Sequence, residues 1–219
     1  MPDYDTLLFD NDGVLVEPPA FETQAAAIRT AFRAVGVDAP DPDHVADICG
    51  GVTPDSLRDI SATYGVDPEA LWDAREHHDE RSQFEQFHAG ARDIYDDVDV
   101  LADLTHPCGV VSNNHHSTVA FVLDHFDLGS HFETYYGRPK TVESLRRKKP
   151  NTHYLDRAMA DLGGEAALYV GDSESDVLAA ENAGLDSVFV RREHSRDVDL
   201  SVAPTHEIET LAGLPRLLE

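Results

Sequence analysis

Short apolar runs that alternate with helical patterns are the feature of this chain that most restricts its fold. The runs end at Phe9, Ser112 and Val170, and each has the length of one buried strand. Segments with helical periodicity, such as those near 152–162 and 174–183, follow the later runs. Strands that alternate with helices of this length form a parallel sheet covered by helices on both faces. We therefore expect an α/β fold.

Between the first two runs the pattern becomes helical. Apolar residues recur at helical spacing from Phe21 to Val35, and Gly36 can end this helix. Further helices are expected near 57–64 and 68–87, and no strand is predicted in this stretch. Four more elements complete the prediction: a helix near 91–104, a helix that carries Val119, Val122, Leu123 and Phe126, and strands near 134–136 and 187–190.

These patterns divide the chain into two domains. We expect a core formed by residues 1–16 and 88–219, and an α-helical cap formed by residues 17–87. The insertion begins just past the first strand, and ligands of open parallel sheets bind at the carboxyl ends of the strands. The cap is therefore expected to act as a lid over the site.

Polar residues gather where the predicted strands end. Asp10 and Asp12 follow the first run, Ser112 ends the second, and Asp172 and Asp176 follow the third. Each group would be a turn or a helix cap if it stood alone. Because the carboxyl ends of parallel strands share one edge of the sheet, we expect these side chains to converge.

The four carboxylates of this set suggest a metal site. Asp10, Asp12, Asp172 and Asp176 would repel one another in a crevice of low dielectric, and a bound divalent cation removes that conflict. Oxygen ligands that leave room for waters and a substrate phosphate are the arrangement that Mg²⁺ favours. We expect Mg²⁺ as the cofactor.

Such a site suits phosphoryl chemistry. One carboxylate can attack phosphorus to give an aspartyl phosphate, while a second serves as general acid and then as general base. A fixed cation must also neutralise the phosphoryl oxygens. Lys149, which precedes Pro150, is the best candidate in a chain with only three Lys, although the adjacent Lys148 is the alternative.

The chain resembles a haloacid dehalogenase-superfamily phosphatase of the subfamily with a helical cap after the first strand, close to phosphoglycolate phosphatases. The resemblance implies a Rossmann-like core and covers all of it. Its four motifs stand in order as Asp10-Asn11-Asp12-Gly13-Val14-Leu15, Val110-Val111-Ser112-Asn113-Asn114, Lys149-Pro150 and Gly171-Asp172-Ser173-Glu174-Ser175-Asp176.

The resemblance also implies a role for each residue. Asp10 would be the nucleophile and Asp12 the acid and base. Asp172 would bind Mg²⁺ together with Asp10 and the backbone carbonyl of Asp12, and Asp176 would support the metal waters or orient Lys149. Ser112 and Lys149 would hold phosphoryl oxygens, with Asn113 at the substrate phosphate.

Within this superfamily we expect a phosphatase that acts on a small phosphorylated metabolite. A sugar-phosphate mutase is the alternative, because it shares every core residue. A 2-haloacid dehalogenase fits less well, since it does not need Asp12. A phosphonate hydrolase needs a cap lysine, and residues 17–87 contain none. A receiver module would be shorter, and an idle binding protein would have lost Asp10 or Asp12.

Composition narrows the partners further. With 42 acidic and 17 basic residues the formal charge is −25, which argues against nucleic acid as a partner. So large an excess suggests adaptation to concentrated salt, where charges are screened. The chain has two isolated cysteines, which fit a reducing compartment, and we find no signal peptide, so we expect a cytoplasmic protein. No apolar run reaches the length of a membrane span, so we expect no binding to membranes. We expect a monomer or a homodimer.

Overall fold

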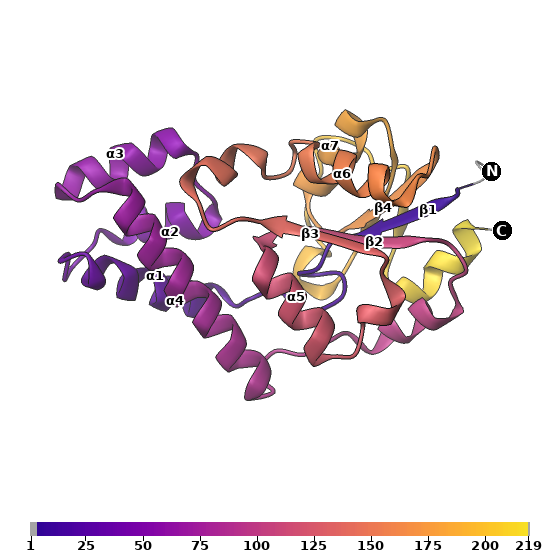
Figure 1. Cartoon of the computed structure of the whole chain (residues 1–219), viewed down its shortest axis with the longest axis horizontal. Coiled ribbons are helices and arrows are strands. Elements are labelled where there is room, and N and C mark those ends of the chain that lie inside the picture. Colours follow the sequence, from indigo (N-terminus) through magenta and orange to yellow (C-terminus); the bar gives the residue numbers. More distant parts are fainter. Residues whose placement is uncertain (1–3, 219) are drawn as a thin grey trace. The chain divides into compact units, whose positions relative to one another are not determined.

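The computed structural model describes residues 4–218 (Figure 1). The chain divides into two compact units. Among the described residues, the α/β unit comprises 4–17, 93–137 and 147–218, and the helical unit comprises 18–92 and 138–146. Within the described residues, none of the helices combines the length and the apolar character that a membrane span requires.

A six-stranded sheet organises the α/β unit. Its order is β3-β2-β1-β4-β5-β6, so the first strand lies in the middle. The pairings of β1 with β2 and β4, and of β5 with β4 and β6, are parallel. The strands are β1 (Thr6–Phe9), β2 (Cys108–His115), β3 (Thr134–Arg138), β4 (Ala167–Gly171), β5 (Asp186–Val190) and β6 (His206–Ile208).

Helices lie on both faces of this sheet, with α5 on one side and α6 and α7 on the other (Figure 1). They are α5 (His116–His125), α6 (His153–Leu162) and α7 (Glu174–Ala183). Short 3₁₀ segments complete the connections: η1 (Asp96–Asp103), η2 (Gly129–His131), η3 (Val142–Arg147), η4 (Glu193–Ser195) and η5 (Leu211–Leu217).

Neighbouring residues of β1 belong to two different hydrophobic cores. Leu7 and Phe9 pack with residues of α5, η1 and η5, whereas Leu8 packs with residues of α6 and α7. Successive side chains of a strand point to opposite faces, so a sheet covered on both faces needs an unbroken apolar run. This arrangement confirms the predicted α/β class with a parallel sheet.

The helical unit has its own core. Its helices are α1 (Phe21–Ala34), α2 (Pro42–Gly50), α3 (Pro54–Tyr64) and α4 (Pro68–His88). Asp41, Thr53 and Asp67 each cap the helix that begins at the following proline, because their side chains accept backbone N–H bonds of the first turn. The buried side chains that hold the helices together include Ile28, Phe32, Leu57, Leu71 and Trp72.

The segment 138–146, which directly follows Gly137 of β3, belongs to the helical unit. Val142 and Leu145 of this segment are buried in the helical core. Arg138 pairs with Glu76 of α4. The sequence division at 17 and 87 did not include this segment, because the residues that bind it are distant in the chain.

Three further details differ from the sequence expectations. The helix expected near 91–104 is the 3₁₀ segment η1, in which the buried Val98 and Leu101 are three positions apart, as a 3₁₀ repeat requires. Helix α2 was not predicted, since it buries only Val45 and Ile48. The edge strand β6 was also missed, because its three residues include one apolar side chain, Ile208.

Candidate active site

The predicted acidic residues meet at the carboxyl edge of the sheet. Phe9 at the end of β1 pairs with Val170 of β4, so Asp10 and Asp172 leave adjacent strands where the strand order reverses. Asp176 joins them from the first turn of α7. One carboxylate oxygen from each of the three lies within 4.8 Å of the others.

This group of three carboxylates fits a divalent cation. Its donors are all hard oxygens, the type that Mg²⁺ prefers. Asp12 does not contribute a carboxylate oxygen to the group. The expected part of Asp12 in metal binding therefore rests on its backbone carbonyl.

Gly13 lets the loop after β1 approach the acidic group. Its φ of +79° lies in the left-handed region that glycine adopts readily. A Cβ atom at this position would stand 2.0 Å from Oδ2 of Asp172. A larger residue would therefore displace the Asp172 carboxylate.

Lys149 is the cation of the site. Its Nζ lies 2.8 Å from Oδ2 of Asp10 and 2.6 Å from Oδ1 of Asp176, and the residue is 6 % exposed. The backbone N–H of Lys149 donates to Oδ1 of Asn113 at 2.8 Å, which fixes the chain where the ammonium must enter. These contacts bring the ammonium of Lys149 to the carboxylates, whereas the neighbouring Lys148 is half-buried.

Tyr169 of β4 is a further part of this cluster that the sequence did not reveal. Nζ of Lys149 donates to its hydroxyl at 2.8 Å, and the hydroxyl donates to the carbonyl of Val111 at 3.0 Å. In the sequence Tyr169 is only one member of an apolar run. A polar tip on an otherwise buried strand, two residues before Gly171, was the available signal.

Asp176 uses both carboxylate oxygens. While Oδ1 pairs with Lys149, Oδ2 accepts hydrogen bonds from the backbone N–H of Ser173 at 3.0 Å and the hydroxyl of Ser173 at 2.7 Å. It thereby caps α7 and holds the lysine at once. Gly171 makes this approach possible, because a Cβ there would lie 2.2 Å from Cβ of Asp176.

Asp12 is held by two side-chain amides. Asn11 donates to Oδ1 at 2.9 Å, and Asn114 donates to Oδ2 at 2.8 Å. Asn114 comes from the end of β2, so it ties the loop after β1 to the neighbouring strand. These amides orient the carboxylate, a role that the sequence pattern assigned to neither residue.

Ser112 lies inside β2, not after it, and is 2 % exposed. Its hydroxyl accepts the backbone N–H of Asn114 at 3.2 Å. The strand continues to His115, because the polar residues Ser112, Asn113 and Asn114 still form strand backbone. Residue type alone had suggested an earlier end.

Burial governs the ionisation of the acidic group. It raises the pKa of Asp10 to about 8, an effect that Lys149 opposes and that the charges of Asp176, Asp172 and Asp12 strengthen. Burial also raises the pKa of Asp172, against a hydrogen bond from His194. A divalent cation would stabilise the ionised form of both carboxylates.

Comparisons with known proteins agree with this geometry. Residues 7–190 match the sequence model of the haloacid dehalogenase-like hydrolases. A 5′-nucleotidase of Pseudomonas aeruginosa is 26 % identical over 99 % of this chain and 96 % of its own. A phosphoglycolate phosphatase of Rhodobacter capsulatus is 29 % identical over 95 % of each.

A solved structure shows the same fold. CbbY from Rhodobacter sphaeroides, determined in complex with phosphate, superimposes with a TM-score of 0.73 at 19 % identity and covers 96 % of both chains. The family match spans most of the α/β unit and all of the helical unit. The chain therefore belongs to the haloacid dehalogenase-like hydrolase family.

Proposed function

We propose that this hydrolase removes the phosphate group from a small phosphorylated metabolite, with Asp10 as the nucleophile and Mg²⁺ as the cofactor. The contact that carries the proposal is the 2.8 Å pair between Lys149 Nζ and Asp10 Oδ2. It sets an ammonium beside a buried carboxylate at the switch point of a parallel sheet. The phosphatase names of the relatives support the same reaction class.

In the proposed reaction a carboxylate oxygen of Asp10 attacks phosphorus and forms an aspartyl phosphate as the bond to the leaving oxygen breaks. Asp12 gives its proton to that oxygen and then accepts a proton from the water that hydrolyses the intermediate. The amides of Asn11 and Asn114 support this role, because they fix the direction of the Asp12 carboxylate.

Lys149 offsets negative charge on the phosphoryl oxygens, and Asp176 keeps its ammonium in place. We assign Ser112 as a further donor to the phosphoryl group. The side-chain oxygen of Asn113 holds the backbone of Lys149, so we propose that Asn113 acts on the substrate at least partly through that lysine.

Asp10, Asp172 and Asp176 would hold the cation, with the backbone carbonyl of Asp12. When bound, Mg²⁺ supplies positive charge that stabilises the phosphoryl oxygens and keeps the carboxylates ionised.

The helical unit, for which 17–87 is the predicted extent, is proposed to be the cap that selects the substrate. Three arginines of this unit bond to neighbours within it: Arg29 to Glu22, Arg33 to Thr30 and Arg58 to Asp55.

Phosphate release from a panel of small phosphomonoesters tests the proposal. The panel should include phosphoglycolate and 5′-mononucleotides, with Mg²⁺ or a chelator. Asp10→Asn should reduce release to background, whereas Asp103→Asn, which changes an exposed aspartate of the same unit, should not alter it. Activity that persists in Asp10→Asn would refute the nucleophile.

The same panel separates the alternatives. Isomerisation of a sugar phosphate without phosphate release would identify a mutase. Halide release from a 2-haloacid would identify a dehalogenase. Either result would replace the phosphatase assignment.

A further inference from the structure

His194 contacts the acidic group from a part of the chain outside the four motifs. It lies in η4, beyond β5, and its Nε2 is 2.6 Å from Oδ2 of Asp172. The two side chains are 33 % and 12 % exposed. The imidazole therefore reaches a mostly buried carboxylate that the proposed function assigns to the cation.

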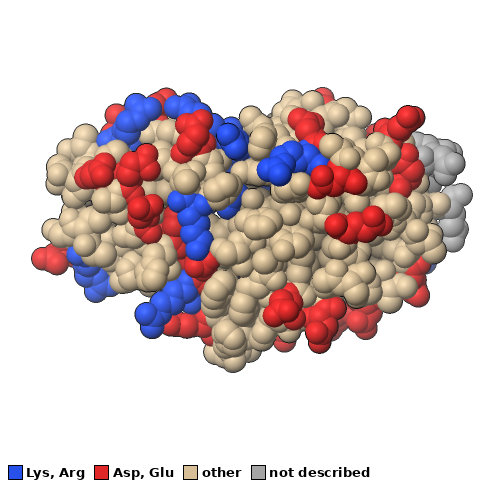
Figure 2. All heavy atoms as spheres, in the orientation of Figure 1, with Lys and Arg blue, Asp and Glu red and all other residues tan. Residues whose placement is uncertain are grey.

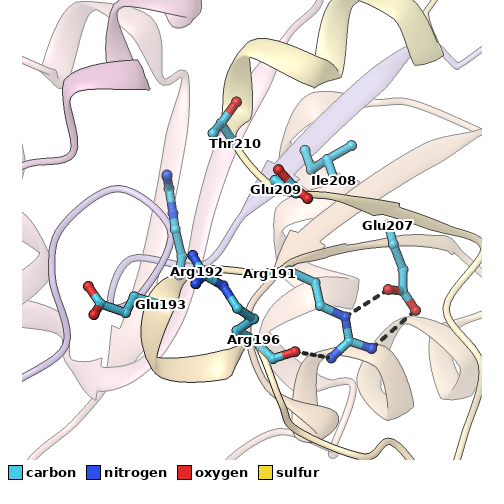
Figure 3. A pocket seen from close by; sticks show the side chains of 8 residues that line it. All are labelled: Arg191, Arg192, Glu193, Arg196, Glu207, Ile208, Glu209 and Thr210. Carbon is cyan, nitrogen blue, oxygen red and sulfur yellow. Dashed lines mark hydrogen bonds and ion pairs between the residues drawn. The ribbon is translucent and has the colours of Figure 1, made fainter.

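Arg191 fixes one side of the segment that carries His194. Its guanidinium pairs with Glu207 of β6 at 2.8 Å. The same group donates to the backbone carbonyl of Val198 at 2.8 Å, and it bonds the carbonyl of Arg196 as well (Figure 3). The turn around His194 is thus closed onto the sheet edge.

Arg192 fixes the other side. Its guanidinium makes a two-point pair with Asp97 at 2.6 and 2.8 Å, and donates to the carbonyl of Val14 at 2.9 Å. Val14 directly follows Gly13, the glycine that faces Asp172. The segment 191–196 is therefore tied to the loop that carries Asp10 and Asp12.

The segment also lines a cavity of about 590 Å³. Figure 3 shows the side chain of Arg191 pointing toward Glu207, whereas that of Arg192 points in a different direction. Both guanidiniums serve to hold the segment in place. Together the two arginines fix the position of His194.

We propose that His194 is a positioning residue that orients the Asp172 carboxylate for Mg²⁺. With its proton on Nε2, the imidazole donates to Oδ2 and fixes the plane of the carboxylate before the cation binds. Hydrogen bonds to metal-binding carboxylates commonly affect metal affinity, and their loss costs on the order of 10- to 100-fold. This inference rests on the proposed metal-dependent function.

Titration calorimetry with Mg²⁺ alone, on the substrate-free protein, tests the inference. His194→Ala should weaken Mg²⁺ binding by roughly 10- to 100-fold. His194→Gln should restore most of it, because its amide can donate from a similar position without a charge. His131→Ala changes a half-buried histidine of the same unit and should bind as the unaltered protein does.

A second measurement separates positioning from a general structural effect. The Mg²⁺ concentration for half-maximal phosphate release should rise in His194→Ala, while KM for substrate at saturating Mg²⁺ stays unchanged. Circular dichroism establishes that each variant is folded.

The possible failures are distinguishable. If the unaltered protein binds Mg²⁺ and His194→Ala binds it equally or more tightly, the inference is wrong and the proposed function stands. If His194→Gln binds as weakly as His194→Ala, the hydrogen bond is not the cause and the inference is also wrong. If the unaltered protein does not bind Mg²⁺, the metal-dependent function and the inference both fail.

Discussion

Arg138 and Glu76 form a two-point ion pair inside the helical unit, although 62 positions separate them, and both nitrogen–oxygen distances are 2.8 Å. Their side chains are 4 % and 1 % exposed. Arg75 also pairs with Glu76 at 3.1 Å, and Trp72 packs against both guanidiniums. The pair attaches the segment 138–146 to α4.

We predict that removal of one partner destabilises the helical unit strongly. Glu76→Gln removes the carboxylate that Arg138 and Arg75 share, and Arg138→Met leaves Glu76 with the 3.1 Å pair to Arg75 in place of the two-point pair. Breaking a buried ion pair from one side typically costs about 3–5 kcal/mol of unfolding free energy. Denaturant unfolding followed by circular dichroism measures the change. Arg146→Met, on the same segment but half-exposed, should have little effect.

The double variant Glu76→Met with Arg138→Leu sharpens this test. Because it removes both charges, it should be more stable than either single variant. Single variants as stable as the unaltered protein would contradict the assigned importance of the pair.

The sequence predicted the α/β fold because the residues that decide it are neighbours. Leu7 and Phe9 pack in one hydrophobic core and Leu8 packs in the other. Because both faces of β1 are buried, the strand is visible in the sequence as an unbroken apolar run. Asp10 and Asp172 were also predictable as neighbours in space, since each directly follows a strand. A residue that directly follows a parallel strand lies at the carboxyl edge of the sheet, so its location follows from that of the strand.

Other features were not predictable, because long-range contacts create them. Asp172 and His194 are 22 positions apart, and no local pattern relates them. In the sequence Tyr169 has the pattern of a core residue, and only the structure shows that its hydroxyl accepts a hydrogen bond from Lys149. The segment 138–146 joins the helical unit only through partners such as Glu76.

Substitution of Lys149 should distinguish it from its neighbour Lys148. The Lys149 ammonium fits among Asp10, Asp176 and the Tyr169 hydroxyl, where a planar guanidinium does not replace it. We expect Lys149→Arg to lower kcat by on the order of 100-fold or more. Lys148→Gln should change kcat much less.

Steady-state phosphate release with each variant measures this difference, and thermal unfolding checks that both are folded. A larger loss in Lys148→Gln than in Lys149→Arg would reverse the assignment of the phosphate-binding lysine.

The effect of Mg²⁺ on thermal stability should grow with pH. Burial raises the pKa of Asp10 from its ordinary 3.8 to about 8, so within that window the folded metal-free protein binds a proton that the unfolded chain does not. This site's contribution to stability therefore decreases as pH rises through the window. Mg²⁺ replaces the proton, and its stabilising effect increases over the same range.

The measurement is Tm with and without Mg²⁺ at several pH values between about 5 and 8. The difference in Tm should rise with pH in the unaltered protein. In Asp10→Asn it should rise less, because Asp172, whose pKa burial also raises, is left as the main titrating ligand. An increase in Tm on addition of Mg²⁺ that is equal at both ends of the pH range would contradict the prediction.

The large negative charge should make stability depend on salt. Four acidic side chains, Asp10, Glu76, Asp79 and Asp176, are buried in the described part of the chain. Figure 2 shows many others at the surface of both units. Their mutual repulsion disfavours the compact state at low ionic strength, and salt shortens the Debye length from about 8 Å at physiological strength to about 3 Å at 1 M.

We therefore expect Tm to rise between about 0.1 M and about 2 M KCl, by roughly 4–8 °C if screening contributes about 2 kcal/mol. Salt can also stabilise proteins without screening their charges. A variant with four exposed aspartates changed to asparagine, at Asp38, Asp47, Asp59 and Asp103, separates the two effects. Because it carries less charge to screen, its Tm should be higher at low salt and rise less with KCl. If the unaltered protein and this variant gain equally, repulsion among surface carboxylates is not the cause, and the proposed adaptation to salt is wrong.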